Sequence, residues 1–197
     1  MAKASVAQMI VKPSAESLAS SARAASKGGL PPVHLWNPPF CGDLDMRIAR
    51  DGTWFYEGTP IGRPGLVKLF SSILRKDDDD YFLVTPVEKV GITVDDAPFV
   101  AVDFVAQSGE ITFETHVGDT VTASRTNPIR VTRDAETGEP SPYVLVRANL
   151  EALIDRKSFY RLVDLGELDE IDGISWFGVR SAGAFFPIIP EDELNGA

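Results

Sequence analysis

Between residues 51 and 86, the hydrophobic pattern changes from alternation to helical spacing and back. An Asp51-Gly52 pair between Ile48 and Trp54 suits a type I′ hairpin turn, because glycine tolerates a positive φ. Apolar side chains then recur every three or four residues, which predicts a helix over residues 64–76. The acidic residues that follow are expected to end this helix, and residues 81–84 are expected to form a strand. The stretch is thus predicted to be a strand, a helix and a second strand.

The chain on either side of this stretch has a different character. Ser14 can cap a helix that runs through Ala25. Residues 30–40 are rich in proline and are expected to be extended. C-terminal to the opening stretch, the pattern is that of strands with hairpin-length loops, which is typical of an antiparallel sheet. Two helices are predicted within that part, over residues 148–155 and from Ser158, as cap, through residue 165.

Two short segments, one in each half of the chain, have a similar residue pattern. Residues 60–69 and 144–153 each give a predicted strand, an arginine, and leucines at the third and sixth positions after it. A duplication would put Arg63 and Arg147 in equivalent places, each at a strand-to-helix junction. The alternative is coincidence, because leucines at this spacing are common in helices.

These patterns predict an α+β fold with two lobes and a repeated strand-helix-strand motif. Residues 1–34 are assigned to an N-terminal helical segment, 35–86 to an N-terminal α+β lobe and 87–197 to a C-terminal β-rich lobe.

The charge balance narrows the classes of partner. The chain of 197 residues has a formal net charge of -10. Such a body repels phosphate backbones, so bulk nucleic-acid binding is disfavoured. A nucleotide-sized ligand held by one or two arginines is compatible with this charge. No apolar run reaches the roughly 18 residues that a membrane-spanning helix needs, so no membrane span is predicted.

Metal, disulfide and cofactor chemistry find little support in the sequence. Cys41 is the single cysteine, so neither an intramolecular disulfide nor a cysteine-based zinc site is expected. A lone cysteine suits a reducing cytoplasm, which is the predicted compartment. The acidic groups around Asp45 and over residues 77–80 lack the spacing of a calcium loop. We therefore predict no metal and no cofactor.

A long motif carries a resemblance to a known family. It consists of LWNPPFCGDLDMRIARDGTWFYEGTPIGRPGLVKLFSSIL followed by YFLVTPVEKVGI. Over residues 35–189 the chain resembles the uncharacterised bacterial family known as domain of unknown function 1285. The resemblance implies a repeated structural motif, a C-terminal part loosely like a pleckstrin-homology fold, and a site between the two parts. It also implies a role in signalling or ligand sensing, and it transfers no catalytic residue.

The two arginines of these similar segments are the strongest candidates for a ligand-binding site. A cation at a helix start opposes the helix dipole. Arg63 and Arg147 are therefore expected to meet either an anionic ligand or an acidic partner. The acidic partners considered are Asp43, Asp45 and Asp103.

The remaining candidates each have a structural alternative. His116 could contact a ligand, or it could serve as a structural hydrogen-bonding group. Trp36 and Trp176 could stack on a ligand ring, or they could anchor the core.

Three functions are compatible with these residues. The first is a non-enzymatic ligand-binding or signalling module that holds an anionic small molecule, such as a nucleotide, between its lobes. The second is a protein-interaction adaptor, in one form a homodimer. The third is a hydrolase or transferase that uses His116, or Cys41 together with His34 or His116.

Overall fold

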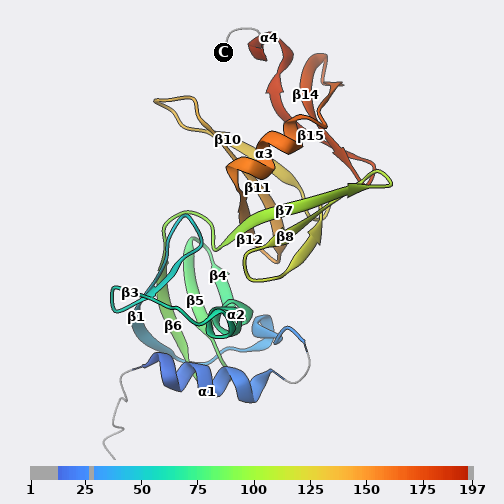
Figure 1. The fold of residues 1–197 in the computed structure, drawn as a ribbon. Helices are drawn as coiled ribbons and strands as arrows, with labels where there is room; N and C mark the ends of the chain where they lie inside the picture. The colour runs from blue at the N-terminus through green and yellow to red at the C-terminus, as the bar shows by residue number, and fades with distance from the viewer. Residues whose placement is uncertain (1–12, 27–28, 195–197) are drawn as a thin grey trace, which may run out of the picture.

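The structure is a computed structural model that describes residues 13–26 and 29–194. These residues form two six-stranded sheets and one three-stranded sheet, with helices between and around them. Each six-stranded sheet is the centre of one lobe, and the second lobe lies above the first in Figure 1, with the small sheet at its far end. The predicted α+β class with two lobes is confirmed.

The first lobe consists of two three-stranded meanders joined by helix α2 (Pro64–Ser72). Its strands are β1 (Phe40–Ile48), β2 (Trp54–Tyr56), β3 (Thr59–Pro60), β4 (Leu74–Asp77), β5 (Asp80–Val84) and β6 (Lys89–Val94). Their order in the sheet is β3-β2-β1-β6-β5-β4, and the central pair β1 and β6 is parallel. Helix α1 (Ala15–Ala25) contacts α2, and Ser14 caps it as predicted. A short 3-10 turn, η1 (Val33–Leu35), follows.

The second lobe repeats this strand topology. Its strands are β7 (Phe99–Gln107), β8 (Glu110–Thr115), β9 (Thr120–Thr122), β10 (Ile129–Arg133), β11 (Pro140–Arg147) and β12 (Leu150–Ile154). Their order is β10-β11-β12-β7-β8-β9, with β7 and β12 parallel at the centre. In both lobes the first strand of one meander therefore pairs in parallel with the last strand of the other. By position in the sheet, β5 corresponds to β11.

The predicted equivalence of Arg63 and Arg147 is wrong. Arg63 is the N-cap residue of α2, whereas Arg147 ends β11 at a hairpin turn. The helix predicted over residues 148–155 is β12, whose alternate residues are buried. Ala148 has φ 48 and turns the chain directly into that strand. The repeated feature is thus the strand topology, because the strand-helix-strand motif around Arg63 has no counterpart at Arg147.

Two boundaries in the first lobe also differ from the prediction. The helix predicted over residues 64–76 ends at Ser72, and β4 pairs with β5 through a turn in which Asp78 has φ 53. The lobe boundary expected after residue 86 lies later, because β6 completes the first sheet between β1 and β5. The chain passes to the second sheet between Val94 and Phe99.

The C-terminal part begins with helix α3 (Arg156–Val163), which Asp155 caps instead of the predicted Ser158. The small sheet consists of β13 (Glu167–Ile171), β14 (Ile174–Ser181) and β15 (Ala184–Pro190), and α4 (Glu191–Leu194) follows it. The likeness of this half to a pleckstrin-homology fold stays a prediction.

Within residues 13–26 and 29–194, no helix has the length and apolar character required to cross a membrane. The helical segment predicted over residues 1–34 can be compared only in part, because residues 1–12 and 27–28 lie outside the described ranges.

Candidate functional site

The side chain of Arg147 joins the two lobes. Its Nη2 donates to the carbonyl oxygen of Ser71 in α2 at 2.8 Å. Its Nη1 donates to the carboxylate of Asp119, in the turn between β8 and β9. The guanidinium also lies over the ring of Phe99, 4.7 Å from the ring centroid. Arg147 therefore has an acidic partner, although Asp119 is none of the three acids considered from the sequence.

A cavity of about 350 Å³ lies beside Arg147 and takes its walls from both lobes. Its lining residues come from the proline-rich segment, from α2 and β4, and from the β11–β12 hairpin: Leu30, Pro31, Pro32, Val33, His34, Ser72, Leu74, Arg75, Arg147, Ala148, Asn149 and Leu150. The lining contains two arginines and a histidine but no carboxylate. The charged side chains that line this inter-lobe cavity are thus basic, whereas the chain as a whole is acidic.

Arg75 holds the proline-rich segment against the first lobe. Its Nη1 donates to the carbonyl oxygens of Val33 and Trp36, at 3.2 and 2.7 Å, and its Nη2 donates to Asp77 at 2.8 Å. Its Nε is buried and finds no acceptor in the part of the chain that the structure describes. Arg75, a lining residue, therefore has one buried donor without an acceptor, which costs free energy.

His116 lies at the same junction but does not line the cavity. Its Nδ1 accepts a hydrogen bond from the backbone N–H of Val100 at 3.1 Å. Its Nε2 is buried close to Gly52, where an added Cβ would approach it to 3.1 Å. Burial lowers the pKa of His116 below its ordinary value. These contacts fit the structural alternative, a neutral histidine that packs one lobe against the other.

The other predicted candidates are spread over the molecule. Arg63 and Asp45 are exposed in the first lobe, and neither lines the inter-lobe cavity. Trp36 packs against the core and reaches the cavity wall only through its carbonyl, which accepts from Arg75. Trp176 lies in β14 of the small sheet. Of the six candidates, only Arg147 lines the cavity.

Two cavity residues were missed as ligand contacts because their positions depend on the fold. Arg75 was predicted to lie in the last turn of a helix, but it is in β4. His34 was considered only as a base for Cys41. In the structure Cys41 Sγ has the carbonyl of Pro39 as its partner, at 3.5 Å.

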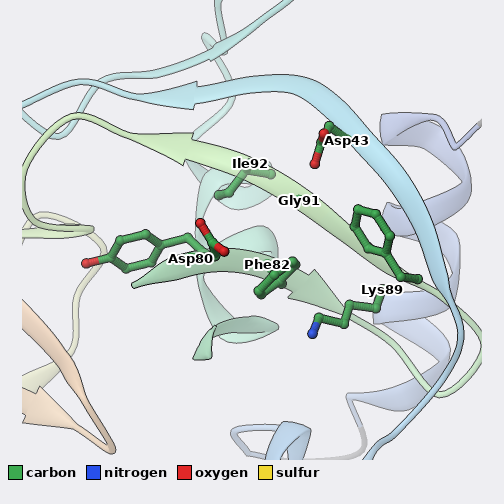
Figure 2. A pocket seen from close by; sticks show the side chains of 8 residues that line it. Asp43, Asp80, Phe82, Lys89, Gly91 and Ile92 are labelled. Carbon is green, nitrogen blue, oxygen red and sulfur yellow. The ribbon is translucent and has the colours of Figure 1, made fainter. Parts of the chain in front are cut away.

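A second cavity, of about 430 Å³, lies on the first sheet (Figure 2). It is lined by residues of β1, β5 and β6: Phe40, Asp43, Asp80, Tyr81, Phe82, Lys89, Gly91 and Ile92. Its lining therefore includes carboxylates as well as aromatic rings, in contrast to the inter-lobe cavity. Among the described residues, no group of three or more histidine, cysteine, aspartate and glutamate side chains could hold a metal ion.

Family models and solved structures give a consistent comparison. The N-terminal domain of DUF1285, a domain of unknown function, matches residues 31–97, and the C-terminal domain of the same family matches residues 98–188. The boundary between these two matches falls between β6 and β7, where the chain changes lobes.

Two crystal structures of DUF1285 family proteins are similar to this chain. The one from Silicibacter pomeroyi DSS-3 is 63% identical, with a TM-score of 0.80, and the match covers 90% of this chain and 97% of that chain. The one from Shewanella baltica OS155 is 32% identical, with a TM-score of 0.50, and the match covers 61% of this chain and 91% of that chain. No curated protein sequence matches the chain.

Proposed function

This chain belongs to the DUF1285 family of proteins of unknown function, and from that premise we propose that it is a non-enzymatic module that binds a small anionic ligand between its two lobes. A module of this kind would act in signalling or ligand sensing, since binding at the junction would bias how the lobes are held together.

One observation carries the proposal: the lining of the inter-lobe cavity combines Arg75, Arg147 and His34 with no carboxylate. Both arginines are less than a quarter exposed, at 16% and 21% of the side chain, so solvent screens them less than surface cations. Each already has an acidic partner, which reduces its net attraction for a ligand. The Nε of Arg75 is buried and has no acceptor among the described residues, so an anion that displaced the covering atoms would gain this donor.

The rest of the lining defines the class of anion. Leu30, Leu74, Leu150 and two prolines supply an apolar wall. Such a wall contributes by excluding water from the apolar part of a ligand. The site therefore favours an acid with an apolar or aromatic body, such as an aryl carboxylate or a nucleoside monophosphate, over inorganic phosphate.

The test is a thermal-shift screen of aryl carboxylates and nucleoside monophosphates, followed by calorimetry of any hit. A ligand at 100 times its dissociation constant should stabilise the fold by about 2.7 kcal/mol. His34→Glu should weaken the hit at least about threefold, because it adds one negative charge at the cavity. Arg63→Gln is the matched control, since it makes the chain more negative by the same amount away from the cavity. The absence of any hit at millimolar ligand, or an equal loss in both variants, would contradict the proposal.

A further inference from the structure

Gly91 creates the hollow on the first sheet that Figure 2 shows. It lies in β6 and pairs with Phe82 on one side and Asp43 on the other. A Cβ at residue 91 would lie 2.1 Å from Oδ1 of Asp43. The missing side chain therefore lets the Asp43 carboxylate lean across β6, and the cavity of about 430 Å³ opens beside it.

This face of the sheet already holds an ammonium group of the protein itself. Lys89 Nζ lies 3.7 Å from the ring centroid of Phe82 and 2.7 Å from Oδ2 of Asp77. Aromatic faces and carboxylates attract ammonium groups in this geometry. Lys89 thus shows that this face accommodates an ammonium group beside an aromatic ring and a carboxylate.

Among the described residues, three groups in the cavity wall form no ion pair or cation–π contact with an ammonium group of the protein. Asp43 and Asp80 are exposed, and neither carboxylate has an ion pair or side-chain hydrogen bond within the described ranges. Phe40 is 57% exposed, although its ring meets that of Phe82 edge to face at 6.1 Å. Asp80 and Phe82 lie on the same face of β5, because side chains alternate along a strand. Phe82 pairs with Gly91, which in turn pairs with Asp43, so both carboxylates lie on the face of the Phe82 ring. The wall therefore offers two carboxylates with an aromatic surface between them.

We propose that this cavity binds a linear organic cation of the polyamine class. Its ammonium groups would pair with Asp43 and Asp80, and its methylene chain would lie against the rings of Phe40 and Phe82. The volume lies within the range of small-molecule sites. A single metal ion is a poorer match, because the wall combines its carboxylates with apolar and aromatic side chains.

The experiment is calorimetric titration of the full chain with spermidine at constant low ionic strength. Asp43→Asn and Asp80→Asn should each weaken binding at least about fivefold, since each removes one ion pair from a desolvated ligand. Phe40→Leu should weaken it to a smaller extent, because it keeps an apolar wall but removes the aromatic ring. All these positions are exposed, and Asp→Asn keeps the side-chain shape, so circular dichroism should show an unchanged fold.

Asp79→Asn provides the matched control, since Asp79 is exposed in the adjacent turn and does not line the cavity. It should leave spermidine affinity within about twofold of wild type, because a single exposed charge outside a site contributes little. An equal loss in Asp79→Asn and Asp43→Asn would overturn the proposal in favour of diffuse attraction by an acidic protein. Tighter binding of a tetralysine peptide than of spermidine would overturn the small-molecule assignment.

Discussion

At the scale of single residues, His116 has surroundings that oppose its protonation. Its Nδ1 accepts from the N–H of Val100, so a proton on that atom would break the hydrogen bond. Burial is the largest influence and lowers its pKa, while neighbouring backbone groups of Val100 and Gly52, and then the carboxylates of Asp119 and Asp51, act in the opposite direction. The folded protein therefore contains the neutral ring under conditions where an unfolded histidine would accept a proton.

This contrast gives the folded state a pH dependence. As pH falls below about 6.5, the unfolded chain gains a proton at residue 116 before the folded chain does. Stability is thus lost from that pH down to the lowered pKa of the folded state. His116→Gln should remove this part of the slope, which is at most about 1.4 kcal/mol per pH unit. Urea denaturation at a series of pH values between neutrality and mild acid measures it.

His34→Gln is the control for this measurement, because His34 is exposed on the proline-rich segment. It removes one histidine without touching the contacts of His116, so a change in slope that both variants share would not come from residue 116. If His116→Gln and wild type lost stability in parallel between neutrality and mild acid, His116 would not be the titrating group.

The leucine spacing after Arg147 predicts a helix that starts there. In the structure Arg147 instead ends a strand and contacts Ser71 and Asp119. Both partners are at least 28 residues away in sequence. Only the strand pairing of the whole lobe brings them together, so their convergence on one guanidinium could not be read from local spacing. The composition of the chain indicated only that an arginine would be needed to hold an anion.

At the scale of elements, the predictions succeeded where local chemistry decides the conformation. The cap of α1 at Ser14 and the hairpin turn around Asp51-Gly52 depend on nearby backbone groups, and both features are present. The type I′ form expected for the turn is wrong, because Gly52 has a positive φ but Asp51 does not, and the Gly52 N–H donates to the carbonyl of Ala49. The helix predicted over residues 148–155 failed because leucines three residues apart suit either structure. There, pairing with β11 and β7 buries alternate side chains and decides in favour of a strand.

The cap of α3 offers a measurable test of such a local contribution. Asp155 Oδ1 accepts from the backbone N–H of Ser158 at 2.7 Å. Asp155→Ala should lower the free energy of unfolding by about 0.5–2 kcal/mol. Asp164→Ala is the control, because Asp164 is at the opposite end of the helix, where an acid opposes the dipole. Urea denaturation of both variants should show a loss for the first alone, and equal midpoints would refute the capping contribution.

At the scale of the whole molecule, the two lobes share a strand order but differ in the segment that connects their two meanders. The first lobe places α2 there, and α2 supplies the Ser71 carbonyl to Arg147 of the second lobe. The second lobe uses a short segment between β9 and β10 in the same place. The inter-lobe cavity arises from this difference, because α2 and β4 form one of its walls.

A small set of polar contacts crosses the junction. Arg50 reaches from the β1–β2 turn to Ser141 Oγ at 2.8 Å and to Asp96 at 3.2 Å. Arg147 adds the bond to Ser71, and Asn149 donates to the carbonyl of Lys76 at 3.1 Å. These contacts are expected to couple the unfolding of the two sheets, chiefly through Arg147, because breaking its bond to Ser71 leaves a partly buried donor without an acceptor.

Hydrogen exchange can test that coupling at Leu83 of β5 and Ala152 of β12, which are both fully buried. In wild type the two amides should open with the same free energy, as expected for one cooperative unit. The double variant Arg50→Ala, Arg147→Gln should separate these free energies by more than about 1 kcal/mol.

The matched double variant Arg63→Ala, Arg125→Gln removes the same number of charges from exposed positions and should leave the two free energies equal. If both double variants kept a common opening free energy, the polar contacts would not be what couples the lobes. The buried surface around His116, Val100 and Gly52 would then carry the coupling. A ligand in the inter-lobe cavity would in that case act on packing, since its arginine contacts would no longer control how the sheets open.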